Sequence, residues 1–239
     1  MMYSLAEGDT AVAFSGRAGG VSVEPFASAN ISTRVGDDPA AVGENRRRLL
    51  DALGVPHATM VTARQVHGAT VVPVSGVTAG QRVVADGLVT RDRNLVLTVG
   101  VADCVPVTLT SREAVGVLHV GWRGLVAGIV DAGVTALHRI GGRSPTAVVG
   151  PSVGPCCYPV GEDVRSAVVG RYPGAAAVSL AGEPSLDLPA AVAEALRRSG
   201  VDDVVPAGGC TAHEADTYFS VRRDGRTGCQ AGMAVLREV

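Results

Sequence analysis

Short apolar runs alternate irregularly with helical segments, and this pattern constrains the fold more than any other feature of the sequence. Runs rich in β-branched residues predict strands at residues 11–14, 58–62, 69–74, 95–100, 105–110, 114–120, 146–149 and 231–236. Helical spacing of apolar residues predicts helices at residues 39–53, 122–140, 162–169 and 188–199. Strict strand–helix alternation is absent, so we expect an α/β or α+β layered fold. Because no Ser/Gly linker or charge run divides the chain, we expect one domain, residues 1–239.

All 21 residues in the Lys+Arg total are arginine, and this excludes several kinds of chemistry. A lysine Schiff base, a Ser–Lys dyad and a lysine-bearing P-loop each need an ammonium group that the sequence does not supply. Any phosphate must therefore be bound by arginine or by backbone N–H groups. The net charge of −2 argues against nucleic acid as a partner.

The amino terminus, the apolar runs and the cysteines indicate the cellular compartment in which the protein is expected. The amino terminus lacks the basic and apolar regions of a secretory signal. The longest apolar stretch, residues 95–109, is interrupted by Asp103 and Pro106 and is too short to span a bilayer. We therefore expect a cytoplasmic protein without membrane contact. Its five cysteines should be free thiols or metal ligands.

One cysteine and two histidines lie at strand ends, where a rigid scaffold exposes side chains. His67 follows a predicted strand, Cys104 separates two apolar runs, and His119 ends a strand. One Cys and two His can form a catalytic zinc site with an open fourth position. The same residues could instead provide a Cys nucleophile with a His base, oriented by the second His or by Asp103. A buried thiol beside hydrogen-bonded histidines is the structural alternative, and the residues alone do not distinguish the three.

Three weaker signals have plainer interpretations. Residues 150–154 match G-x-S-x-G, but the following segment contains two prolines and does not start the helix that a nucleophile elbow needs. Cys156 and Cys157 are interpreted as a buried pair of thiols, because adjacent side chains rarely reach one ion. The turn at residues 121–124, with Arg123, could hold an anion, although a plain tight turn explains it equally well.

Taken in order, the motifs resemble those of the YfiH-type family over nearly the whole chain. The matching segments are residues 14–22, 28–30, 36–39, 44–46, 65–68, 85–87, 102–104, 119–124, 150–161 and 218–225. The family has been called laccase-domain protein, purine nucleoside phosphorylase and peptidoglycan editing factor. One departure is that Gly228 is followed by Cys229, where the family usually has arginine.

The resemblance implies a single layered α/β domain similar to the cysteine-hydrolase fold of cytotoxic necrotizing factor toxins. It also implies zinc held by His67, Cys104 and His119, which are then the catalytic residues as well. Asn30, Arg46, Gln65 and Arg123 stand in neighbouring motifs and are candidates for contact with substrate or phosphate. Copper is the less favoured metal: a type 1 copper site would use two of the five histidines, and three cannot furnish a further three-copper cluster in the usual way.

Three functions follow as hypotheses. The first is a phosphorylase that converts adenosine, inosine or methylthioadenosine and phosphate into free base and ribose 1-phosphate, with adenosine deamination as a side activity. The zinc-deaminase pattern H-x-E with P-C-x-x-C is absent, so deamination would need an independent solution. The second is an editing hydrolase acting on a peptidoglycan precursor with Cys104 as nucleophile. The third, a non-catalytic partner of the envelope machinery, ranks last. The oligomeric state does not follow from the sequence.

Overall fold

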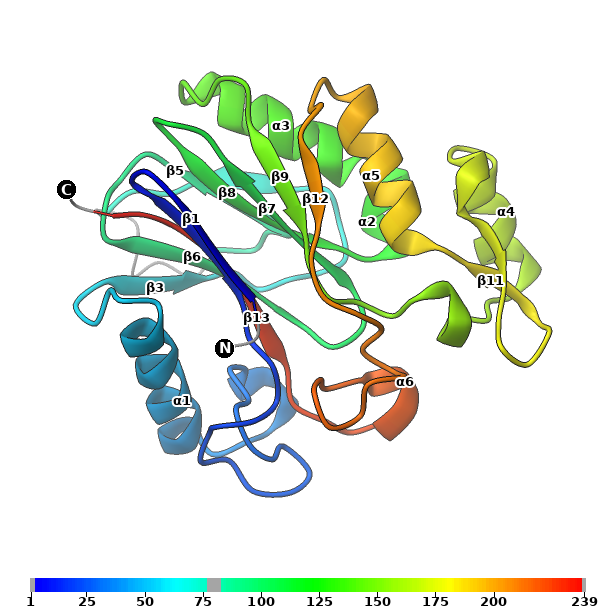
Figure 1. The fold of residues 1–239 in the computed structure, drawn as a ribbon, viewed down its shortest axis with the longest axis horizontal. Helices are drawn as coiled ribbons and strands as arrows, with labels where there is room; N and C mark the ends of the chain where they lie inside the picture. Colours follow the sequence, from blue (N-terminus) through cyan, green and yellow to red (C-terminus); the bar gives the residue numbers. More distant parts are fainter. Residues whose placement is uncertain (1–2, 77–82, 238–239) are drawn as a thin grey trace.

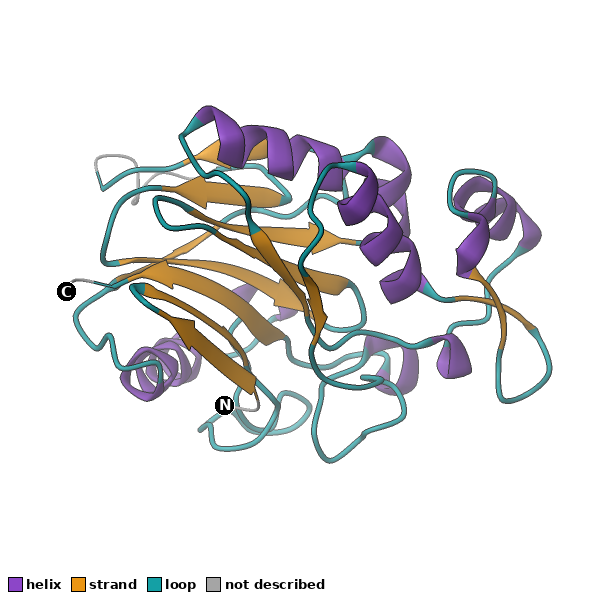
Figure 2. Ribbon diagram, turned by 45° about the horizontal axis from the view of Figure 1, so that its top comes forward, coloured by secondary structure: helices purple, strands orange, loops and turns teal. Residues whose placement is uncertain are grey.

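The computed structural model describes residues 3–76 and 83–237, which are arranged in four layers, helix, sheet, sheet and helix (Figures 1 and 2). One sheet has five strands in the order β1-β2-β13-β6-β3. Their bounds are β1 Tyr3–Glu7, β2 Thr10–Phe14, β13 Gln230–Leu236, β6 Leu95–Val101 and β3 Thr59–Thr62. Neighbouring strands are antiparallel except β3 and β6, which are parallel.

The second sheet has six strands in the order β12-β9-β7-β8-β5-β4. Their bounds are β12 Val204–Pro206, β9 Thr146–Val149, β7 Val105–Thr110, β8 Val115–Val120, β5 Gly87–Thr90 and β4 Val71–Pro73. The pairs β12/β9 and β4/β5 are parallel and the others antiparallel. A small ribbon of β10 (Ala176–Val178) and β11 (Pro184–Leu186) lies apart from both sheets.

Three apolar clusters hold the layers together. Phe14, Leu97 and Val117 belong to the cluster between the two sheets. Helix α1 (Pro39–Ala52) covers the outer face of the five-stranded sheet through Leu49 and Leu50. Helices α2 (Trp122–Ala127), α3 (Ile129–Arg139) and α5 (Leu188–Arg198) cover the other sheet. The remaining helices are α4 (Glu162–Val169), α6 (Val221–Asp224) and the 3₁₀ turns η1 (Thr33–Val35), η2 (Pro155–Cys157) and η3 (Pro173–Ala175).

The layered α/β class is confirmed, and each predicted strand or helix lies within two residues of an observed one, with one exception. The segment predicted as a single helix over residues 122–140 is two helices, because Gly128 between α2 and α3 has φ +90° and ends the first. Strands β1, β5, β10, β11 and β12 and helix α6 were not predicted. They are three to five residues long, a length that gives little periodicity, and of the strands as short as these only β2, β3, β4 and β9 were predicted.

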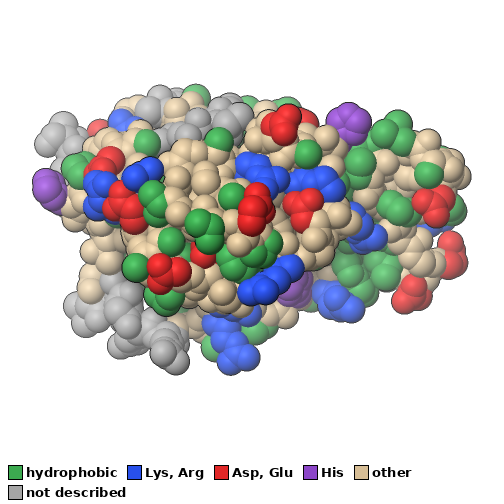
Figure 3. Space-filling view, turned by 90° about the horizontal axis from the view of Figure 1, so that it is seen from below, with side chains coloured by type: hydrophobic (Ala, Val, Ile, Leu, Met, Phe, Trp, Pro, Cys, Tyr) green, Lys and Arg blue, Asp and Glu red, His purple; other side chains and the backbone are tan. Residues whose placement is uncertain are grey.

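Three consecutive arginines, Arg46–Arg48, form the longest basic run of the sequence and lie on α1, where only part of the run is solvated. Arg47 and Arg48 are exposed and pair with Glu44, whereas Arg46 is half-buried. On the face seen in Figure 3, basic and acidic side chains lie close together. Within residues 3–76 and 83–237, none of the helices has the length and apolar character needed to cross a bilayer.

Candidate metal centre and active site

The register of the six-stranded sheet brings Cys104 and His119 together. Strands β7 and β8 are antiparallel, with Val105 opposite Val120 and Pro106 opposite His119. Cys104 directly precedes β7, so its side chain emerges beside the end of β8. His119 is the last residue but one of β8 and is 3 % exposed. Residues 15 positions apart therefore meet because the two strands form a hairpin.

Asp86 attaches His67 to the same edge of the sheet. It precedes β5, whose first residue, Gly87, pairs with Leu118 next to His119. The Asp86 carboxylate accepts hydrogen bonds from the N–H groups of Val66, His67 and Gly68 at 2.7–3.2 Å. It also lies 2.9 Å from Nδ1 of His119. His67 has φ +60°, and this left-handed conformation is held by the carboxylate.

The donor atoms of His67, Cys104 and His119 all lie within 4.8 Å of one another. The two imidazole rings meet edge to face, with centroids 4.8 Å apart. Burial opposes ionisation of Cys104, but hydrogen bonds with His119 and His67 outweigh it and lower the pKa of the thiol to about 6. Burial likewise disfavours the charged form of His119, yet Asp86 and Cys104 raise its pKa to about 9. The metal-free site thus favours a thiolate, the form a metal ion needs.

Gly121 makes this close approach possible. A Cβ atom at this position would lie 3.1 Å from Cδ2 of His67 and 3.2 Å from Sγ of Cys104. Gly121 is also the N-cap residue of α2. The turn at residues 121–124, considered above as an anion site, therefore packs against the two ligands.

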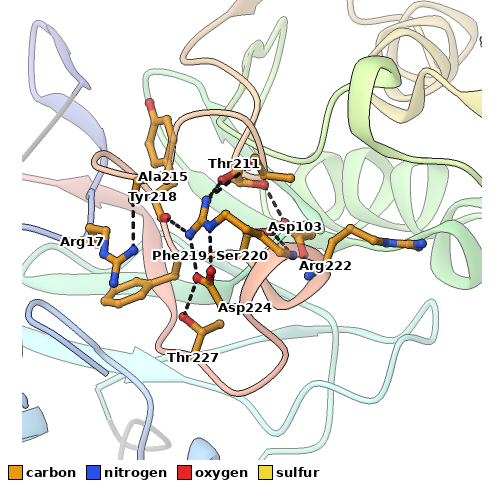
Figure 4. Close-up of polar contacts among 12 residues, drawn as sticks. Arg17, Asp103, Thr211, Ala215, Tyr218, Phe219, Ser220, Arg222, Asp224 and Thr227 are labelled. Carbon is orange, nitrogen blue, oxygen red and sulfur yellow. Dashed lines mark hydrogen bonds and ion pairs between the residues drawn. The ribbon is translucent and has the colours of Figure 1, made fainter. Parts of the chain in front are cut away.

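Asp103, which directly precedes Cys104, is bound by residues of the C-terminal segment (Figure 4). Its Oδ1 accepts hydrogen bonds from Thr211 Oγ1 at 2.7 Å and Ser220 Oγ at 2.6 Å, and its Oδ2 accepts from the N–H of Arg222 at 2.7 Å. Asp103 has φ +95°, a left-handed conformation that these three bonds stabilise. It therefore links the Cys104 loop to the C-terminal segment and does not orient a histidine.

The three ligand residues line a pocket of about 380 Å³. Gln65 lies in its wall, where its side chain donates to the carbonyl of Gly100 at 2.8 Å and accepts from the N–H of Gly100 at 3.1 Å. Arg46 is also in the wall, with its Nε donating to the carbonyl of Ile31 at 2.9 Å. Burial lowers the pKa of Arg46, and an anion in the pocket would relieve that cost. Arg34, which the sequence did not single out, lines the pocket too and donates to the carbonyl of Gln65.

Asn30 and Arg123 are not brought to this pocket. Asn30 is fully buried; its amide nitrogen donates to Ser32 and Asp37, and its oxygen accepts from the N–H groups of Ser32 and Cys229. Asn30 is therefore hydrogen-bonded to Ser32 and Cys229, which line the pocket, and is not itself part of the pocket surface. Arg123 is exposed and stacks over Trp122, 4.5 Å from the ring centroid. Cys229, at the position where the family usually has arginine, lies in the pocket wall.

The other sequence signals fall outside the pocket. Ser152 of the G-x-S-x-G match is 3 % exposed and leads into the 3₁₀ turn η2, in agreement with the rejection of a nucleophile elbow. The interpretation of Cys156 and Cys157 as a buried pair is wrong. Both are half-buried, and they form a cluster with Cys210, which a neighbouring loop brings to them.

The donor set fits a metal site that keeps one position open. Two imidazoles and a thiolate converge on a pocket, and the other ring nitrogen of His119 is oriented by a carboxylate, as is usual for metal-ligating histidines. The fold and this site together define the class: a four-layered α/β protein with a Cys/His₂ centre at the end of a β-hairpin. Solved structures share the fold. A crystal structure of YlmD from Geobacillus stearothermophilus is 32 % identical with a TM-score of 0.87, covering 96 % of this chain and 93 % of that one.

The family follows from the sequence match. The chain belongs to the YfiH-type family, whose model, described as multi-copper polyphenol oxidoreductase laccase, matches residues 11–237. A crystal structure of Bacillus licheniformis YfiH is 30 % identical with a TM-score of 0.88, covering 95 % of this chain and 93 % of that one. A protein of Streptomyces griseus named purine nucleoside phosphorylase is 41 % identical over 235 residues, 96 % of this chain and 95 % of the relative. A Streptomyces coelicolor protein with the same name is 42 % identical over 230 residues, 93 % of this chain and 94 % of the relative.

Proposed function

We propose that this chain is a zinc-dependent purine nucleoside phosphorylase. Its substrates would be a purine nucleoside such as adenosine, inosine or methylthioadenosine together with inorganic phosphate. The observation that carries the proposal is the convergence of His67, Cys104 and His119 on a pocket whose wall also contains Arg46. The names of the Streptomyces relatives support the choice of reaction.

Zinc is preferred over copper because of the ligand inventory. Of the five histidines, His57, His138 and His213 join neither ligand cluster in the described residues, so the copper cluster of a multicopper oxidase has no ligand set there. Zinc accepts two imidazoles and one thiolate and leaves a fourth position for substrate. When bound, it would supply Lewis acidity toward a substrate oxygen or nitrogen atom.

The arginines of the pocket wall would position the phosphate for the reaction, and water would supply the proton that the leaving purine takes up. A phosphate oxygen forms a bond to C1′ of the ribose while the C1′–N9 bond breaks, and the purine leaves with the bonding electron pair and takes up a proton. Arg46 and Arg34 would hold the phosphate through charge-assisted hydrogen bonds and align it for this displacement. At about 380 Å³ the pocket has the size of a small-ligand site. Adenosine deamination would be a side activity of the same pocket.

A panel of nucleosides with and without phosphate tests this reaction. Adenosine, inosine and methylthioadenosine are each incubated with the purified protein, and free base, ribose 1-phosphate and inosine formed from adenosine are quantified. We expect base release that depends on phosphate and yields ribose 1-phosphate in equal amount. Base release that is independent of phosphate would indicate hydrolysis and contradict a phosphorylase.

A second candidate is the editing hydrolase, favoured by the acidic thiol of Cys104. His119 contacts both Cys104 and Asp86, which is the order nucleophile, base and orienting carboxylate. Iodoacetamide labelling separates the two candidates. As a phosphorylase, the protein should lose Cys104 reactivity when zinc is added to the chelator-treated form. If Cys104 is alkylated equally fast with zinc and turnover of a peptidoglycan precursor is lost with it, the nucleophile role is favoured.

A further inference from the structure

The structure contains a second sulfur cluster, formed by Cys156, Cys157 and Cys210, outside the pocket described above. Its three Sγ atoms lie within 4.8 Å of one another. Cys156 and Cys157 belong to the 3₁₀ turn η2, whereas Cys210 follows β12. A parallel bridge between Ser152 and Cys210, with the N–H of Thr211 donating to the carbonyl of Ser152 at 3.0 Å, joins the two loops. The cluster is thus built by backbone pairing between segments more than 50 residues apart.

The backbone is shaped around the sulfur atoms. The N–H of Gly154 donates to Sγ of Cys210 at 3.2 Å. A Cβ atom on Gly154 would lie 3.3 Å from Cβ of Cys210 and 3.5 Å from Sγ of Cys156. An added Cβ would therefore be tight against Cβ of Cys210 and in van der Waals contact with the sulfur atoms, so the backbone at Gly154 lies directly against the cluster. All five cysteines of the chain are free, and the three of this cluster are half-buried, so an ion can reach them.

The electrostatics of the cluster favour a bound cation. Burial opposes ionisation of Cys210, but the N–H groups of Gly154 and His213 outweigh it and lower the pKa of this thiol. Burial and the neighbouring Cys210 raise the pKa of Cys156 to about 12. The backbone N–H groups therefore favour the thiolate form of Cys210, and a negative charge there disfavours ionisation of Cys156. A cation among the three sulfurs removes that repulsion and releases the thiol protons to solvent.

We propose that Cys156, Cys157 and Cys210 form a second metal site, which takes a thiophilic d¹⁰ cation, Cu⁺ or Zn²⁺, through three sulfur ligands. Three soft donors without an imidazole select such ions over hard cations. A disulfide would use only two of the three sulfurs and leave the third unexplained.

The site has a structural role in holding the pocket together. Thr211, next to Cys210, donates to Asp103, and Asp103 directly precedes Cys104. An ion that crosslinks η2 to the Cys210 loop therefore fixes the anchor of the Cys104 loop. The ion lies outside the pocket and does not contact the substrate.

Metal titration in a background without the first centre tests the proposal. The Cys104→Ala variant is stripped, kept reduced, and titrated separately with Zn²⁺ alone and with Cu⁺ alone. We expect about one equivalent of at least one ion, with thiolate-to-copper absorption in the Cu⁺ titration. Ions held only by the two remaining histidines would not give that absorption. Binding should fall at least tenfold when Cys210→Ser is added. Adding Cys229→Ser, a thiol outside the cluster, should leave binding unchanged.

The outcomes are separable. Retention of Zn²⁺ alone identifies a zinc site, and retention of Cu⁺ alone identifies a cuprous site. Circular dichroism of Cys104→Ala/Cys210→Ser verifies folding, and Cys157→Ser replaces Cys210→Ser if that variant fails. The proposal is overturned if neither ion binds, if binding is unchanged by the substitution within the cluster, or if the reduced protein re-forms a disulfide between two of the three cysteines in preference to binding metal. This titration measures metal binding alone, so its outcome does not depend on whether the protein is a phosphorylase.

Discussion

Asp86 is the side chain on which the geometry of the metal centre most depends. It joins the His67 loop to His119 through hydrogen bonds from three backbone N–H groups and one imidazole nitrogen. Burial raises its pKa, but the bonds from His119, Gly68 and Val66 outweigh this and hold the pKa below its usual range. The sequence marked residues 85–87 only as a matching segment, because the role of Asp86 depends on the pairing of β5 with β8, which places Asp86 beside His119. His67, Cys104 and His119 could be found, since ligand-type residues at strand ends are visible in the chain itself.

Replacing Asp86 with asparagine should weaken zinc binding about ten- to hundredfold, the usual effect of losing a carboxylate behind a metal-ligating histidine. Competition with a chromophoric chelator measures the affinity, and circular dichroism verifies the fold. Asp92→Asn is the matched control, because Asp92 also accepts from a backbone N–H, that of Gly76, but at a distant turn. Equal affinities in Asp86→Asn and the parent would contradict the assigned role.

Arg46 should bind the phosphate. Replacing it with glutamine removes charge-assisted hydrogen bonds worth about 1.5–3 kcal/mol, which corresponds to a rise of about ten- to hundredfold in the KM for phosphate. The KM for the nucleoside should change much less. Arg47→Gln, on the same helix but exposed and paired with Glu44 and Asp51, is the control and should leave both values unchanged. A selective effect on the nucleoside KM would place the phosphate elsewhere.

Between elements, the break at Gly128 is the feature that sequence periodicity concealed. Apolar residues keep helical spacing through residues 122–140, yet Gly128 turns the chain between α2 and α3. The periodicity reports which residues face the sheet, and it persists across a single left-handed residue. The sequence also did not show that Cys210 belongs with Cys156 and Cys157. These residues meet only because Ser152 pairs with Cys210, more than 50 residues away along the chain.

Gly128→Ala should destabilise the protein by about 1–2 kcal/mol, because a Cβ atom disfavours φ +90°. This corresponds to a fall in Tm of roughly 2–8 °C for a chain of this size. Gly43→Ala, inside α1 with open space around the added Cβ, should instead stabilise by about 0.5–1 kcal/mol. Thermal unfolding should show a lower Tm for Gly128→Ala and a higher Tm for Gly43→Ala. A loss of stability in Gly43→Ala would contradict the explanation by backbone conformation.

Across the molecule, the two sheets and their covering helices place the centre where several loops meet. The ends of β7 and β8, the loop before β4 and the C-terminal segment around Ser220 all contribute contacts. The layered class could be predicted, since the apolar runs reveal which segments are buried. The order of strands could not, because β13 near one end of the chain pairs with β2 near the other end and with β6 in the middle. The sequence likewise did not single out Arg34, because only the folded structure brings it beside Gln65 in the pocket wall.

We propose that the His67, Cys104 and His119 centre carries zinc and supports phosphorolysis. The most direct test of this proposal measures zinc content and phosphate-dependent release of base from inosine in the same preparations of wild type and Cys104→Ala. We expect the substitution to remove one zinc per chain and to lower base release at least a hundredfold, and we expect wild type stripped of metal to regain activity on reloading. Base release that persists undiminished in Cys104→Ala, or in the stripped wild type, would contradict the proposal.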